Sequence, residues 1–274
     1  LESDPPDIVI IVDADCRVCD DAFHHMVMEV AATGRPTQAL YLMMGPKQAR
    51  ANYKFAEFTW RVKNWLRPCG LHKLHMPCQM MGTGMAVPWA VVKSASLANG
   101  ELVEDLRLGL ELTLAGHPPV FCSSARVTSE FPLSKTGFDS QRQRWEHGNI
   151  GFIFINIPRF VQKALVTRNW LLLVLCLDAA VPPLGLLALL LTVMIMLSGM
   201  SAMLGLSPNA LIVSVASFSV FVTAVFLAWL ACGRDVFPPR AVLSLGPYVV
   251  GKLLFYGTLV TRGRVSQWIR TDRN

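Results

Sequence analysis

The chain has 274 residues, of which 53% are hydrophobic, and its mean hydropathy is positive. This is enough apolar material for one globular domain and for additional membrane-spanning segments. The seven cysteines are odd in number and lack regular pairing, which argues against a disulfide framework and favours a reducing compartment. The net charge of +6 is concentrated in residues 233–274, where seven Lys or Arg accompany two Asp. Such a tail beside apolar segments favours an anionic lipid surface or a diphosphate, so we do not expect nucleic-acid binding.

The first half of the chain has the patterns of an α/β domain. Apolar residues at helical spacing predict an amphipathic helix over 52–66, which we expect to be ended by Pro68 and Gly70. A second helix is predicted over 102–115, and a strand over 120–129.

The second half is dominated by long apolar segments. Apolar and polar residues mix over 150–165, which indicates a helix in the membrane interface. The segments 170–197 and 210–232 are almost uncharged, and each is long enough to cross a hydrocarbon core of about 20 residues. The link 198–209 carries no charge, whereas Arg and Lys flank the pair of predicted spans, so both flanks are expected on the cytoplasmic side.

Two apolar segments contain polar or helix-breaking residues. Asp178 and the pair Pro182-Pro183 lie inside the first predicted span, where they are costly in lipid. We therefore expect them to face protein or to mark a kink. The stretch 241–260 has Lys252 at its centre, which favours an interfacial or re-entrant helix over a third span.

An acidic pair follows the first apolar run. In the run 7–12, Asp7 is followed by five β-branched apolar residues, the pattern of a strand buried on both faces of a parallel sheet, and Asp13 and Asp15 come next. Ligands gather beyond the carboxyl ends of such strands, and two carboxylates there can hold a divalent ion against a diphosphate. Two alternatives remain open, namely solvated turn residues and a haloacid-dehalogenase phosphatase in which Asp13 is the nucleophile.

Two other spacings are compatible with zinc. Cys16 and Cys19 form a C-x2-C pair, and a second group repeats at intervals of three residues. The apolar surroundings of this second group favour an ordinary loop. The group consists of Cys69, His72, His75 and Cys78.

Five segments together resemble the family 2 glycosyltransferases of the cellulose, chitin and hyaluronan synthase type, and especially bacterial exopolysaccharide glycosyltransferases. They occur in the family's order and span nearly the whole chain. The family usually has Thr before the Glu-Asp pair, where this chain has Val103. The segments are VDADC at 12–16, MGTGMA at 81–86, VED at 103–105, QRQRW at 141–145 and WIRTDR at 268–273.

The resemblance implies an α/β GT-A-type nucleotide-diphospho-sugar transferase domain followed by transmembrane and interfacial α-helices. Residues 1–148 would form the C-terminal half of that domain, and 149–168 an interfacial amphipathic helix. Two transmembrane helices are expected within 169–232, followed by the interfacial or re-entrant helix and basic tail at 233–274. Since family members have strands before the acidic pair, the chain is expected to be truncated at its N-terminus.

The resemblance also implies roles for the acidic residues. Asp13 and Asp15 would hold Mg²⁺ or Mn²⁺ on the donor diphosphate. Asp105 would be the general base for the acceptor hydroxyl, with Glu104 beside it in the substrate site. An inverting displacement needs only one such base. The alternative for Glu104 and Asp105 is favourable placement of acidic groups at a helix N-terminus.

The Q-x-x-R-W segment implies sugar and phosphate contacts. Trp145 offers a flat platform for a sugar ring, Arg144 offers donors to phosphate, and Gln141 shares a helical face with Trp145. The alternative is that Trp145 anchors the domain at the membrane interface.

Two further segments complete the implied site. The loop of Gly82, Thr83 and Gly84 would line the acceptor pocket, because glycines let backbone approach a ligand closely. The C-terminal segment would fold back over the nucleotide, with a juxtamembrane basic anchor as the alternative. The residues concerned are Trp268, Arg270 and Arg273.

The sequence thus predicts a membrane-bound inverting enzyme that moves a sugar from a nucleotide-diphosphate donor to a growing polysaccharide or a lipid-linked acceptor. Its partners would be the donor, the glycan or lipid-linked acceptor and membrane lipids. The bacterial inner membrane is the expected location, with the catalytic domain and the C-terminus on the cytoplasmic side.

Overall fold

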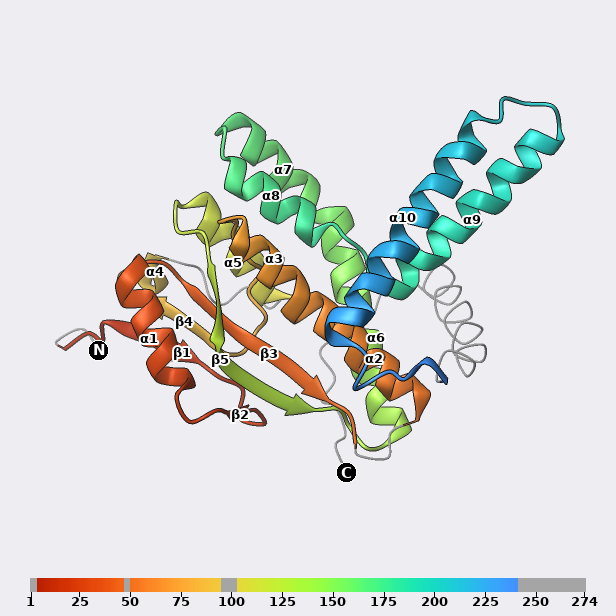
Figure 1. The fold of residues 1–274 in the computed structure, drawn as a ribbon. Coiled ribbons are helices and arrows are strands. Elements are labelled where there is room, and N and C mark those ends of the chain that lie inside the picture. Colours follow the sequence, from red (N-terminus) through yellow and green to blue (C-terminus); the bar gives the residue numbers. More distant parts are fainter. Residues whose placement is uncertain (1–3, 47–49, 95–102, 241–274) are drawn as a thin grey trace.

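The computed structural model describes residues 4–46, 50–94 and 103–240 (Figure 1). In this part of the chain, an α/β domain carries two helical hairpins, α7–α8 and α9–α10, which project to the same side. The predicted helix at 241–260 and the tail residues Trp268, Arg270 and Arg273 lie outside the described residues. The strands are β1 (Ile8–Ile11), β2 (Arg17–Val18), β3 (Thr37–Met44), β4 (Met85–Pro88) and β5 (Val120–Glu130).

The helices alternate with these strands and then follow them. A π-helical segment, η1 (Val62–Leu66), separates α2 from α3. The α-helices are α1 (Ala22–Thr33), α2 (Ala51–Arg61), α3 (Arg67–Lys73), α4 (Trp89–Ser94), α5 (Glu104–Leu114), α6 (Lys135–Ile155), α7 (Ile157–Val166), α8 (Trp170–Ala179), α9 (Leu184–Met203) and α10 (Asn209–Cys232).

The five strands form one mixed sheet in the order β1-β4-β3-β5-β2. Only β3 and β5 pair in parallel, with Thr37 opposite Val120, and the other neighbours are antiparallel. The prediction of a strand within 7–12 is confirmed by β1, but the prediction that this strand is buried between parallel neighbours was wrong. Among the described residues, β1 is an edge strand antiparallel to β4, and its four residues are only half-buried. An apolar run of four residues does not specify the direction of its neighbour.

The core lies on both faces of the central strand β3, which is buried except at its last residue. Tyr41 and Met43 pack with helix α1, through Met26, on one face. Leu40 and Leu42 alternate onto the other face, as the two-residue period of a strand requires. The predicted strand at 120–129 and helix at 102–115 are confirmed by β5 and α5.

The helix predicted over 52–66 does not end at Pro68 and Gly70. It continues through the π turn at Val62–Leu66 into α3, which ends at Lys73. A proline inside an α-helix removes a hydrogen bond and its ring clashes with the preceding turn. The wider π turn directly before Pro68 accommodates the ring, and one helical glycine costs only about 1 kcal/mol.

The segment predicted as one interfacial helix forms parts of two helices, α6 and α7. The prediction placed one helix over 150–165, but α6 already starts at Lys135, and the chain bends at Asn156 before α7 begins. Pro158 explains the division, because proline is accepted in the first turn of a helix and not in its interior. The expected domain boundary at 148 therefore falls inside α6.

The first predicted span, 170–197, is broken at 180–183. Helix α8 has only 10 residues, and α9 starts after the proline pair and continues to Met203. The helices long and apolar enough to cross a membrane are α9 and α10, with mean hydropathies of 2.2 and 2.4 and only 6% of each apolar window buried. Helix α10 coincides with the second predicted span and has the length and composition to cross a membrane. Few of these side chains pack against protein, unlike those of a soluble core helix.

Helix α8 packs one face against the protein. Leu172, Leu175 and Cys176 are fully buried against α5 and α7. Asp178, at the end of α8, pairs with the Arg67 guanidinium of α3 and accepts a hydrogen bond from the Gln79 amide at 2.6 Å. The expectation that Asp178 faces protein is therefore confirmed, and this contact ties α3 of the α/β domain to α8.

We expect Asp178→Ala to destabilise the fold, because it leaves the half-buried Arg67 guanidinium without its carboxylate. The loss should be about 2–3 kcal/mol, somewhat less than for a fully buried pair. Unfolding by urea in detergent measures it. Glu130→Ala, which removes the partner of Arg17 in an exposed ion pair, is the control and should change little. Equal stability of the two variants would contradict a structural role for the Arg67–Asp178 pair.

Candidate active site

Asp13 and Asp15 lie on the turn that follows β1. The Asp13 carbonyl accepts a hydrogen bond from the Cys16 N–H at 3.0 Å, which closes the turn. Ligand atoms of Asp13, Asp15 and Cys16 all lie within 4.8 Å of one another, and both carboxylates are exposed. Carboxylate oxygens are the ligands that Mg²⁺ and Mn²⁺ prefer, so these residues fit the divalent ion that the sequence predicts.

The sequence pattern paired Cys16 with Cys19 as a possible zinc site, whereas the structure places its thiol beside Asp13 and Asp15. Burial raises the pKa of its thiol, and the Thr83 hydroxyl, which donates to its sulfur at 3.5 Å, partly offsets that rise. A neutral thiol is a poor ligand for hard ions. The two carboxylates therefore remain the ligands for a hard ion here.

The Gly-Thr-Gly loop connects the acidic turn to helix α5. The Thr83 hydroxyl accepts a hydrogen bond from the Asp13 N–H at 3.0 Å. Gly82 has φ +84°, and a Cβ on it would lie 3.4 Å from the Asp105 carboxylate oxygen. Gly84 has φ +64°, and a Cβ there would lie 2.9 Å from a Val127 methyl group. Glycine at both positions thus allows a left-handed loop to pass close to the carboxylate and to β5.

Gln38 of β3 forms hydrogen bonds with this loop. Its amide nitrogen donates to the Thr83 carbonyl at 2.9 Å, and its oxygen accepts from the Met81 N–H at 2.8 Å. Its side chain is completely buried in β3. A buried amide must satisfy its hydrogen-bonding groups, so Gln38 fixes the loop's position. The sequence analysis missed this residue, although one amide inside an apolar strand was the available signal.

Asp105 occupies the first turn of α5, beside the exposed Glu104. Burial raises the pKa of its carboxyl, and the backbone N–H groups of Leu106 and Asp105 and the charge of Lys63 partly oppose that rise. The acidic turn, the glycine loop and Asp105 therefore lie together at one edge of the fold.

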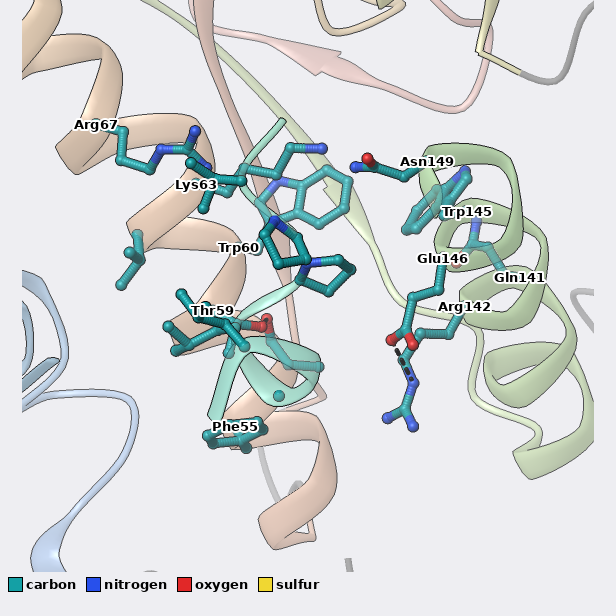
Figure 2. A pocket seen from close by; sticks show the side chains of 18 of the residues that line it. Phe55, Thr59, Trp60, Lys63, Arg67, Gln141, Arg142, Trp145, Glu146 and Asn149 are labelled. Carbon is teal, nitrogen blue, oxygen red and sulfur yellow. Dashed lines mark hydrogen bonds and ion pairs between the residues drawn. The ribbon is translucent and has the colours of Figure 1, made fainter. Parts of the chain in front are cut away.

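A cavity of about 190 Å³ lies between the α2–η1–α3 segment and α6 (Figure 2), and Lys63, whose charge acts on Asp105, is in its wall. The turn between α8 and α9, residues 179–187, forms a third wall. Gln141 and Trp145 line it, as expected of residues on one helical face, whereas Arg144 is not among the lining residues. Figure 2 shows Phe55, Thr59, Trp60, Lys63 and Arg67 along one wall, and Gln141, Arg142, Trp145, Glu146 and Asn149 along α6.

Trp60 is a cavity residue that the sequence analysis did not identify. Its ring lies 4.9 Å from that of Trp145, centroid to centroid, at an interplanar angle of 40°. Its indole N–H donates to the Tyr41 carbonyl at 3.2 Å. Trp60 is thereby fixed to the sheet and supports the indole of Trp145.

The second predicted cysteine and histidine group does not converge in this way. Cys78 is buried with Leu40, whereas His72 and His75 are exposed. Cys19 accepts a hydrogen bond from the Arg126 guanidinium at 3.1 Å. In the described part of the chain, the group with metal-ligand spacing is the acidic turn.

Comparison with known proteins gives a family for the chain. No curated protein matches the chain. The family described as glycosyl transferase family group 2 matches residues 8–232, which include the acidic turn, the glycine loop, Asp105, the α6 motif and both long apolar helices. This family implies a GT-A nucleotide-sugar transferase fold, and the mixed sheet with its helices fits that fold. The chain therefore belongs to glycosyl transferase family group 2.

Proposed function

We propose that the chain is a membrane-bound inverting glycosyltransferase that moves a sugar from a nucleotide diphosphate to a growing polysaccharide or a lipid-linked acceptor. The contact of one loop with two acidic elements carries the proposal. Thr83 binds the backbone of Asp13, and its neighbour Gly82 lies against Asp105. The donor diphosphate and the acceptor hydroxyl can thus be held on either side of one short segment. Neither the fold nor the family match supports the phosphatase interpretation.

The donor side is the acidic turn. Asp13 and Asp15 would hold Mg²⁺ or Mn²⁺, which supplies positive charge to the diphosphate. Arg144 remains predicted to contact phosphate, and Trp268, Arg270 and Arg273 to cover the nucleotide. The nucleoside diphosphate, which is the leaving group, would therefore lie at the acidic turn.

Asp105 takes the proton from the acceptor hydroxyl. The acceptor oxygen then bonds to the anomeric carbon while the bond from that carbon to the diphosphate oxygen breaks, and the nucleoside diphosphate leaves with the electron pair. One base on the face opposite the leaving group gives inversion. The raised pKa of the Asp105 carboxyl makes it a stronger base than a solvated aspartate. Glu104 and the glycine loop remain predicted to contact the substrate beside Asp105.

The acceptor side is the cavity, where Trp145 and Gln141 provide an aromatic face and an amide. We expect Trp145→Ala to raise the KM for the acceptor about tenfold with little change in the KM for the donor, because a sugar–aromatic contact of 1–2 kcal/mol is lost. Initial rates with both substrates varied separately measure this. The control is Trp170→Ala, an exposed tryptophan outside the cavity. A rise confined to the donor KM would contradict the assignment.

The membrane helices are α9 and α10, and the α7–α8 hairpin packs directly on α5. The charged flanks and the uncharged link favour a cytoplasmic active site, in a bacterial inner membrane. We also propose that α9 and α10 contact membrane lipids.

Donor turnover tests the function. The full-length protein in membranes is incubated with radiolabelled nucleotide sugars, and the nucleoside diphosphate and the new linkage are analysed. Release of nucleoside diphosphate with an inverted linkage is expected. Phosphate release from a simple ester, with no sugar transferred from any donor, would refute the proposal.

A further inference from the structure

Lys63 occupies an unusual place in the cavity wall. It belongs to the π turn η1, a type of segment that is rare in proteins and frequent at functional sites. Its side chain lines the cavity opposite α6, with part of its length accessible to solvent and its ammonium group surrounded by protein (Figure 2). Lys63 is therefore presented to whatever enters the cavity.

The other cations of the cavity are neutralised within the protein. Arg67 pairs with Asp178, and Arg142 pairs with Glu146 at 3.5 Å. Lys63 makes no hydrogen bond and no ion pair within the part of the chain that the structure describes. A cation facing a cavity without a partner is a site for an anion.

The electrostatic surroundings of Lys63 agree with that interpretation. Burial and the nearby Arg67 lower the pKa of its ammonium, while Asp105 and Asp178 raise it. The protein therefore removes part of the hydration of the Lys63 ammonium, and the Asp105 and Asp178 carboxylates act on it without forming an ion pair. A bound oxyanion would restore the missing interaction.

The rest of the cavity indicates an amphiphilic ligand. The side-chain oxygen of Asn149 is buried without a hydrogen-bond partner, and Figure 2 shows its amide directed toward the opposite wall. A hydroxyl group would satisfy it. The turn at 179–187 adds apolar lining, including Val181 and Leu184, which leads into α9. One ligand with an anion, a hydroxyl and an apolar part would match all three features.

We propose that Lys63 binds a phosphate or carboxylate group of an amphiphilic acceptor, which enters the cavity beside α9. The inference rests on the proposed function, since it treats the cavity as the acceptor site. The donor diphosphate is not this anion, because Asp13 and Asp15 are absent from the cavity lining. Two sources share the required chemistry, namely a lipid phosphate and an acidic sugar on a lipid.

Three probes with one alkyl chain separate these sources. Dodecyl phosphate carries the lipid phosphate, dodecyl glucuronide carries an acidic sugar, and dodecyl glucoside is its neutral counterpart. Binding of each probe to the full chain in zwitterionic nanodiscs is measured by calorimetry. The proteins are the wild type, Lys63→Gln, Lys63→Arg and Lys73→Gln, an exposed lysine of α3 outside the cavity. Partitioning into the bilayer is the same for all four and cancels.

The wild type should bind at least one anionic probe about tenfold more tightly than the glucoside, as expected for a charge-assisted hydrogen bond. Lys63→Gln should lose this preference, whereas Lys63→Arg and Lys73→Gln should keep it. Tighter binding of dodecyl phosphate identifies a lipid phosphate, and tighter binding of the glucuronide identifies an acidic sugar. Equal binding of all three probes, or an unchanged preference in Lys63→Gln, would overturn the inference.

Sugar transfer, measured on the same samples, separates this inference from the proposed function. Sugar transfer from a nucleotide donor, combined with an unchanged preference among the three probes in Lys63→Gln, would leave the function in place and remove the anion site. Lys63-dependent anion binding without nucleoside diphosphate release from any donor would refute the function and, with it, the acceptor role of the site.

Discussion

Asp105→Asn should lower kcat for sugar transfer by 10²- to 10⁴-fold, the usual contribution of a positioned general base. The amide keeps the shape of the side chain beside Gly82, so substrate binding should be nearly unchanged. Steady-state kinetics with purified protein separate kcat from the KM for the donor. Glu111→Gln is the matched control, because it changes another acidic residue of α5 that pairs with Arg107. It should keep most of the activity.

The pH dependence gives a second measurement of the same role. Asp105 must be deprotonated to act as a base, so kcat should rise with pH on the acid side, above the ordinary range of an aspartate. Removing the charge of Lys63 takes away a group that lowers the pKa of this carboxyl, so Lys63→Gln should move the rise to higher pH. An Asp105→Asn variant with more than about a tenth of the wild-type rate would exclude the general-base role.

Sequence patterns correctly predicted the helices and strands whose formation depends mainly on neighbouring residues. Alternating and helical periods located β5 and α5, and the uncharged run of 210–232 located α10. Predictions failed where distant contacts or backbone geometry decide. The direction of the strand beside β1 depends on β4, some 75 residues later, and the π turn that accommodates Pro68 has no short sequence signal.

The residues around the cavity show the same limit more clearly. Trp145 could be selected because its motif is contiguous, whereas Trp60 and Lys63 lie on an ordinary amphipathic helix in the sequence. Their role follows only from the placement of α6 against η1. The pairing of Arg67 with Asp178, 111 residues apart, likewise depends on the fold, although a carboxylate in an apolar run did predict that a protein partner exists.

The acidic turn carries the last prediction. Asp13→Asn and Asp15→Asn should each lower transfer by more than about 100-fold, since each removes a carboxylate from the group suited to Mg²⁺ or Mn²⁺. Both side chains are exposed, so folding and membrane insertion should be unchanged. Asp20→Asn, an exposed aspartate a few residues further on, is the control and should remain active.

Metal binding provides a readout that does not depend on turnover. Titration of MnCl₂ in the presence of a nucleoside diphosphate, followed by electron paramagnetic resonance, should show bound Mn²⁺ in the wild type and in Asp20→Asn. Asp13→Asn and Asp15→Asn should bind it more weakly, because hard cations bind through carboxylate oxygens. Excess chelator should abolish transfer, and renewed Mg²⁺ or Mn²⁺ should restore it. Full transfer in excess chelator would show that the two carboxylates act without an ion and would remove the metal from the mechanism.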